Sequence, residues 1–216
     1  MKSIVIALLL ITLPEIPTHA ESDIPADITI LYEDVVEQAI NNCPNAKPGK
    51  VSPTLLWELV KVEKTFKVPA ELRGMILAAA CKESGYNPEA RGDRKFSKDG
   101  KTPMALGILQ MWKIYEKMYP GIDRTNPKQA AIGWMSHIVS KIPKVKKRCK
   151  YKTQERIWVA AWVTGIRSKK IGGRCRERPK HYKLLKRWHR NIEKQRRQER
   201  EEYIPSVRKL KKGDGC

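Results

Sequence analysis

The residue whose position most suggests chemistry is Glu83, a carboxylate at the end of an apolar helical pattern. Apolar residues at helical spacing precede it and predict a stripe facing the protein core: Leu72, Met75, Ile76, Ala79 and Ala80. At 100° per residue, Glu83 lies about 20° from Leu72 around the helix axis. We therefore expect this carboxylate on a face that is otherwise buried.

Two features of the helix end act on the Glu83 carboxyl. Gly85 is placed to end the helix as its carboxyl-terminal cap, so Glu83 falls in the last turn. The negative end of the helix dipole disfavours a charge there, and burial acts in the same direction. Both effects favour the protonated form, which a glycosidase needs to protonate the leaving glycosidic oxygen. The alternative is a glutamate at a helix end that pairs with a nearby Lys or Arg.

Helices must position this carboxylate, because helix signals are frequent along the chain and strand signals are scarce. Sequences typical of helix starts occur at Ser52-Pro53, Pro69, Asn126-Pro127, Thr153 and Pro179. Residues 27–42 also show helical periodicity, whereas the polar segment from Gly85 to Thr102 is typical of a loop. The expected fold class is mainly α.

The last helix is amphipathic and basic. Its apolar stripe consists of Tyr182, Leu185, Trp188 and Ile192. Such a helix either docks on its own domain or lies on a membrane surface, and we favour docking. The helix is expected to fray after Arg196, with a disordered tail from Pro205 to Cys216.

The positive charge is concentrated in the last third of the chain. Residues 1–140 carry 17 Lys and Arg against 16 Asp and Glu, whereas residues 141–216 carry 27 against 7, a net of +20. A cation of this size predicts contact with a polyanion. The alternative is a solvated basic face that only keeps the protein soluble.

The first twenty residues predict export. Lys2 is followed by an apolar run from Ile4 to Leu13, and Thr18-His19-Ala20 offers small residues for cleavage after Ala20. The run is too short to span a bilayer, which takes about 20 residues. The mature protein is therefore expected to be periplasmic or secreted. Export argues against nucleic acid as a partner and favours the anionic surface of a bacterial envelope.

The cysteines fit an oxidising compartment. Cys43, Cys81, Cys149, Cys175 and Cys216 follow the predicted cleavage site, and an odd number leaves at least one outside any disulfide within the chain. We expect a Cys149–Cys175 bond and, as a weaker second, Cys43–Cys81, although sequence alone does not determine connectivity. No CxxC pair occurs and the histidines do not cluster, so no metal or organic cofactor is predicted.

The segments around Glu83 carry a resemblance to a known family. Glu83-Ser84-Gly85-Tyr86-Asn87-Pro88 is followed at a distance by Ala105-Leu106-Gly107-Ile108-Leu109-Gln110-Met111. Together these motifs resemble the signature of the soluble lytic transglycosylase family, in the lysozyme superfamily. A third family motif is matched in degenerate form by Ala161-Trp162-Val163-Thr164-Gly165. The resemblance covers roughly residues 55–166.

The resemblance implies a role for individual residues. Glu83 matches the family's catalytic acid, and Ser84 matches a neighbour that helps to position the substrate. Gln110 matches a glutamine that lines the glycan groove, where its amide can bond a sugar's acetamido group. Gly107 matches a small residue that lets the backbone approach the sugar.

The sequence predicts three parts. After the predicted signal peptide, residues 1–20, come residues 21–178, for which the resemblance implies a lysozyme-like helical domain with a groove across its face. Residues 179–216 then form a basic helical extension and tail.

The third motif departs from the family at its central positions. Trp162 stands where the family has a tyrosine that hydrogen-bonds the catalytic carboxyl, and an indole donates one hydrogen bond but accepts none. Val163 replaces an asparagine. Either the acid is oriented differently here, or Tyr151 or another residue supplies the missing group.

A long loop from Arg91 to Met104 bears on the mechanism, because it holds Asp93 and Asp99. Family transglycosylases use one carboxyl group, and the substrate's own N-acetyl group attacks the anomeric carbon to give a 1,6-anhydro sugar. Inverting lysozymes need a second carboxylate that activates water. Either aspartate is a candidate for that carboxylate, but Gly92-Asp93 and Asp99-Gly100 are also typical turn pairs, and both residues could simply shape the groove.

The leading hypothesis is an exported lytic transglycosylase that breaks the MurNAc–GlcNAc β-1,4 bond of peptidoglycan glycan strands. A lysozyme on the same scaffold is the first alternative. A non-catalytic, cationic wall-binding protein is the second. A membrane-active or nucleic-acid-binding protein driven by residues 141–216 is the third, and it would lose activity steeply with salt.

Overall fold

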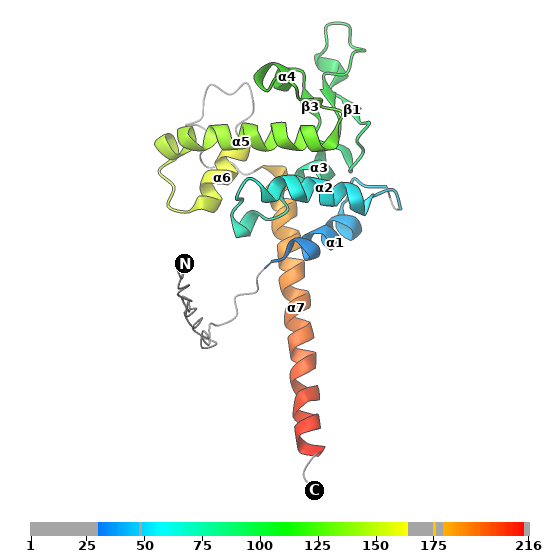
Figure 1. The fold of residues 1–216 in the computed structure, drawn as a ribbon, viewed down its shortest axis with the longest axis vertical. Helices are drawn as coiled ribbons and strands as arrows, with labels where there is room; N and C mark the ends of the chain where they lie inside the picture. The colour runs from blue at the N-terminus through cyan, green and yellow to red at the C-terminus, as the bar shows by residue number, and fades with distance from the viewer. Residues whose placement is uncertain (1–29, 48, 164–174, 176–178, 214–216) are drawn as a thin grey trace, which may run out of the picture.

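The computed structural model describes residues 30–47, 49–163, 175 and 179–213, and this part of the chain is mainly helical, as predicted (Figure 1). The predicted signal peptide lies outside the described residues. In chain order the elements are α1 (Tyr32–Asn42), α2 (Pro53–Lys64), η1 (Ala70–Leu72), α3 (Met75–Ser84), β1 (Arg91–Gly92), η2 (Arg94–Phe96), β2 (Ala105–Leu106), β3 (Met111–Trp112), α4 (Ile114–Met118), α5 (Pro127–Cys149), α6 (Gln154–Val163) and α7 (Lys180–Gly213). None of the helices described is long and apolar enough to cross a membrane.

Helix α3 lies at the centre of the core. The predicted apolar stripe is buried, but every other residue from Met75 to Cys81 is buried as well. This enclosure arises because α1, α2 and α7 all pack against α3. The core therefore surrounds the helix that carries Glu83 until its last turn.

The start of α3 differs from the prediction. Pro69 opens only the short helix η1, and α3 begins after Gly74. Gly74 has a φ of +83°, and a Cβ there would lie 2.1 Å from Cγ1 of Val35. Only glycine combines this left-handed turn with so close an approach of α1.

Three other predicted helix starts, at Ser52, Asn126 and Thr153, are confirmed by their caps. Ser52 accepts a hydrogen bond from the Leu55 N–H, and Asn126 accepts one from the Gln129 N–H. The Thr153 hydroxyl accepts one from the next helix, α6. Helix α5 then packs against both α2 and α6, which extends the core on the far side of α2.

Helix α7 is the longest element. Its predicted stripe is buried against α3 and α1, so docking on its own domain is confirmed: Tyr182, Leu185, Trp188 and Ile192. Beyond this stripe the structure differs from the predicted fraying and disordered tail, because the backbone stays helical to Gly213. Figure 1 shows this C-terminal part extending away from the other helices.

The segment predicted as a loop, Gly85 to Thr102, contributes one strand to a small antiparallel sheet, whose other two strands follow it. Strands β1, β2 and β3 have two residues each and follow one another in the order β1-β2-β3. Arg91 pairs with Leu106, and Ala105 pairs with Trp112. This sheet connects the end of α3 to α4.

Both predicted disulfides are present. Cys43–Cys81 links the end of α1 to α3, two residues before Glu83. Cys149–Cys175 links the end of α5 to the chain that precedes α7. Cys216 lies outside the described residues.

Candidate active site

Glu83 lies in the last turn of α3, where the helix leaves the core. Its side chain is 39% exposed, so the prediction of a buried face is wrong at this position. Full burial of α3 ends at Cys81, and the last turn of the helix is open to solvent on one side. Gly85 ends the helix with a φ of +60°, as predicted, and a Cβ there would lie 2.0 Å from the Asn45 carbonyl oxygen.

A histidine contacts the Glu83 carboxyl. Nε2 of His181, in the first turn of α7, lies 2.7 Å from Oε1 of Glu83. Sequence reasoning did not identify this residue, because 98 positions separate the two and His181 belongs to no motif. Its one signal was the neighbouring apolar stripe, which predicted that this end of α7 docks on the domain. His181 thus gives the Glu83 carboxyl a hydrogen-bond partner from a distant segment of the chain.

Trp162 stacks against the ring of this histidine. The two rings are stacked, with centroids 5.7 Å apart and an angle of 10° between their planes. Trp134 of α5 in turn packs edge-on against Trp162, at 5.8 Å. Tyr151, the other candidate partner of Glu83, is partly buried against the core. The part of the third motif beyond Val163 lies outside the described residues.

Tyr115 of α4 borders the same carboxyl. Its ring packs edge-on against His137 at 5.3 Å. Burial, and after it the charges of Tyr119 and Glu83, raise the pKa of Tyr115 above its ordinary value. The Tyr115 hydroxyl therefore stays protonated at neutral pH and remains a potential hydrogen-bond donor near Glu83.

Ser84 and Gly107 join the end of α3 to the sheet. The Ser84 hydroxyl lies 2.8 Å from the Ile108 carbonyl oxygen and 3.2 Å from that of Ala80, and it donates to these acceptors. Gly107 has a φ of +74°, and a Cβ there would lie 2.0 Å from the Arg124 carbonyl oxygen. The close contact with Arg124 is therefore sufficient to require glycine at position 107, with or without a sugar bound nearby.

Gln110 braces the same region. Its amide nitrogen donates to the carbonyl oxygens of Ala90 and Gly107, at 3.0 and 2.9 Å. Its Oε1 lies 2.2 Å from where a Cβ on Gly92 would stand. The Gln110 amide N–H groups are therefore already hydrogen-bonded within the protein, where they hold two loop segments together. A sugar acetamido group that bonded this amide would have to compete with these contacts or share them.

The two loop aspartates are engaged within or beside their own loop. Asp93 accepts a hydrogen bond from the indole N–H of Trp112 at 2.8 Å. Asp99 accepts hydrogen bonds from Thr102, Ser97 and Lys101, and these hold the pKa of its carboxyl well below the ordinary value. Asp99 thus caps a turn, which is the alternative that its pairing with Gly100 suggested.

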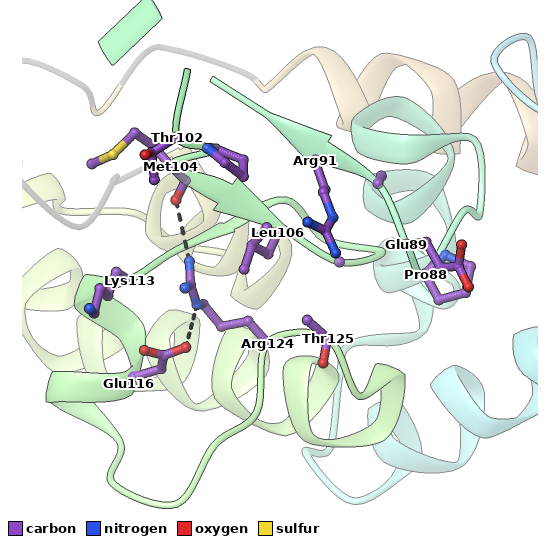
Figure 2. A pocket seen from close by; sticks show the side chains of 13 residues that line it. Pro88, Glu89, Arg91, Thr102, Met104, Leu106, Lys113, Glu116, Arg124 and Thr125 are labelled. Carbon is purple, nitrogen blue, oxygen red and sulfur yellow. Dashed lines mark hydrogen bonds and ion pairs between the residues drawn. The ribbon is translucent and has the colours of Figure 1, made fainter. Parts of the chain in front are cut away.

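A cavity of about 1010 Å³ opens between the sheet and α4 (Figure 2). Gly107 lines it, whereas Glu83, Ser84 and Gln110 are not among the lining residues. On one wall lies the buried Arg124, whose Nε donates to Glu116 at 2.6 Å and whose Nη1 donates to the Met104 and Met111 carbonyls.

Comparison of this chain with protein-family models, with curated proteins and with solved structures gives no match. Within the described ranges, no group of three or more His, Cys, Asp or Glu side chains could hold a metal ion. Fold and site together define a mainly helical protein that presents one partly exposed, histidine-bonded carboxyl at the end of a buried helix.

Proposed function

We propose that this protein is an exported lytic transglycosylase that cleaves the MurNAc–GlcNAc β-1,4 bond of peptidoglycan, with Glu83 as its single catalytic acid. The observation that carries the proposal is the setting of Glu83. The Glu83 carboxyl lies at the surface, at the end of a buried helix, and the 2.7 Å contact with His181 holds one of its oxygens in place. The motifs at residues 83–88 and 105–111 support the substrate class and a lysozyme-like fold.

The proposed reaction needs one carboxyl group. Glu83 gives its proton to the glycosidic oxygen as the bond from that oxygen to C1 of MurNAc breaks. The acetamido oxygen of the same sugar bonds to C1 and carries the positive charge. The Glu83 carboxylate then removes the proton of the 6-hydroxyl, whose oxygen attacks C1 and displaces the acetamido oxygen. The product is a 1,6-anhydro sugar, no water is consumed, and Glu83 is protonated again.

The loop aspartates favour this reaction over hydrolysis. An inverting lysozyme needs a second carboxylate free to activate water. The Asp99 carboxylate instead accepts hydrogen bonds from Ser97, Lys101 and Thr102, and Asp93 is bonded to the Trp112 indole. A lysozyme on the same scaffold is the outcome that product analysis distinguishes.

We also propose that the basic end of the chain holds the enzyme near an anionic envelope surface. The last turn of α5 contributes the exposed cations Lys146, Lys147 and Arg148. Helix α7 adds further Lys and Arg along its length. A cationic face raises the local concentration of an enzyme on an anionic polymer.

The direct test is digestion of purified peptidoglycan by the mature protein and by Glu83→Gln, with mass spectrometry of the released fragments. Glu58→Gln is the control, because Glu58 is an exposed glutamate on the neighbouring helix α2. We expect anhydro-muramyl ends from the wild type and the control, and none from Glu83→Gln. Reducing ends would identify a lysozyme, and equal digestion by all three proteins would reject Glu83 as the acid.

A further inference from the structure

We propose that His181 is a positioning residue for Glu83, with its Nε2–H donating to Oε1 so that Oε2 carries the proton that is transferred. This inference builds on the proposed role of Glu83 as the catalytic acid. It assigns to α7, which lies outside the motif-bearing segments, a part of the active site.

Packing against neighbouring side chains fixes the position of the His181 ring. One face lies on the Trp162 indole, and that indole is held edge-on by Trp134. The histidine is itself only 21% exposed, compared with 39% for Glu83. Behind it, Leu185 and Trp188 anchor α7 in the core. The ring therefore cannot follow the Glu83 carboxyl, and the carboxyl must adapt to it.

The tautomer follows from the second ring nitrogen. Nδ1 of His181 is buried, and it has no hydrogen-bond partner among the residues that the structure describes. A proton on Nδ1 would be a buried donor without an acceptor, which is costly. The favoured tautomer thus carries its proton on Nε2, and that N–H points at Oε1 of Glu83, which lies 2.7 Å from Nε2.

A hydrogen-bond donor at Oε1 gives the two oxygens of the Glu83 carboxyl different roles. In the acid form, Oε1 is the carbonyl oxygen that accepts from Nε2–H, so the acidic proton resides on Oε2. Oε2 has no hydrogen-bond donor within the described part of the chain, which leaves it available to a substrate. After the proton has left, the same Nε2–H bonds a carboxylate and becomes stronger. The contact therefore stabilises the state that follows proton transfer.

The test compares His181→Ala and His181→Gln with Tyr182→Phe and Glu83→Gln. The glutamine amide restores a donor near the position of Nε2, whereas alanine removes it. Tyr182→Phe is the matched control, because it removes the 2.7 Å hydrogen bond from the Tyr182 hydroxyl to Glu155, which ties the same turn of α7 to α6, and it leaves His181 in place. Steady-state kinetics on soluble glycan strands and thermal unfolding are measured for each variant.

We expect His181→Ala to lower kcat by about 10- to 100-fold with little change in KM, as is typical when a supporting partner is lost. His181→Gln should recover kcat to within a few-fold, and Tyr182→Phe should retain it. Wild-type kcat in His181→Ala would overturn the inference. So would an equal loss in Tyr182→Phe, or a folded His181→Gln as impaired as His181→Ala.

The control Glu83→Gln separates the two proposals. Full activity in that variant rejects Glu83 as the acid, and with it the proposed function. An inactive Glu83→Gln together with an unaffected His181→Ala rejects only the positioning role. If His181→Ala does not fold, the comparison of His181→Gln with Tyr182→Phe still tests the positioning role of His181.

¹⁵N NMR of labelled histidine adds a readout that a purely structural role would not move. We expect His181 in the folded wild type to carry its proton on Nε2 at neutral pH. A proton on Nδ1 with a bare Nε2 would overturn the assignment.

Discussion

The carboxylate of Glu63 accepts a hydrogen bond from the backbone N–H of Gly74 at 2.6 Å, and so caps the amino end of α3. Its second oxygen accepts from the Ile76 N–H at 2.9 Å. Two glutamates therefore lie at opposite ends of one buried helix. Glu63 is completely buried and holds the start of the helix, whereas Glu83 is partly exposed at its end.

The stability of the protein should depend on the ionisation of Glu63. Burial raises the pKa of Glu63 from 4.5 to about 7, although hydrogen bonds from Ile76, Gly74 and Tyr32 oppose the shift. The folded state thus binds this proton more tightly than the unfolded chain does. The Glu63 contribution is fully present below pH 4.5 and is lost as pH rises toward about 7. Urea unfolding at several pH values across this window measures the effect.

Glu63→Gln is the control for this pH dependence, because glutamine cannot titrate. His189 acts in the opposite sense: burial lowers its pKa below 6.5, so its contribution is lost as pH falls. The difference between wild type and Glu63→Gln isolates Glu63. A difference that stays constant across the window would contradict the prediction.

Replacing Gly107 by alanine should disrupt the junction between the sheet and α5. A Cβ at this position would lie 2.0 Å from the backbone oxygen of Arg124, which has little room to move because the Arg124 side chain is also bonded. Gly100→Ala is the matched control, because Gly100 has a similar left-handed φ of +63° with open space around it.

We expect Gly100→Ala to cost about 1 kcal/mol from backbone strain alone. Gly107→Ala should cost roughly 2 kcal/mol more, from the clash. Denaturant unfolding of both variants provides the measurement, and equal losses would show that the Arg124 contact does not matter.

Loss of the Cys43–Cys81 bond should destabilise the helix that carries Glu83. The bond joins residues 38 positions apart. Closing a loop of that length restricts the unfolded chain by about 3 to 4 kcal/mol in the chain-entropy account. The double variant Cys43→Ser with Cys81→Ser should therefore show this loss in urea unfolding. Cys216→Ser, which affects neither bond, should leave the stability unchanged.

Asp93 and Asp99 should be dispensable for the chemical step. Asp93→Asn keeps an oxygen that can accept from the Trp112 indole, and Asp99→Asn keeps one acceptor for the turn N–H groups. We expect both variants to cleave glycan within about threefold of the wild-type rate, far from the loss of tenfold or more expected for a general base. A loss of a hundredfold in either one, with reducing ends in the wild-type products, would indicate hydrolysis.

Local sequence was sufficient for features that depend on neighbouring residues. The caps at Ser52, Asn126 and Thr153 were predictable, because a side-chain oxygen and the N–H group it bonds lie three residues apart. The left-handed cap at Gly85 followed from its place after an apolar helical run. The docking stripe of α7 was visible as a periodicity. These features need no knowledge of what lies across the core.

Tertiary structure decided what distant segments do to one another. Sequence placed Glu83 on a buried face, but exposure depends on how closely α1, α2 and α7 pack around α3, and full burial ends at Cys81. Nothing local distinguishes His181 from any other histidine. It meets Glu83 because the apolar stripe of α7 sets both the axis and the rotation of that helix against α3. The carboxyl at the end of α3 was thus predictable from sequence, whereas its hydrogen-bond partner was determined only by helix packing.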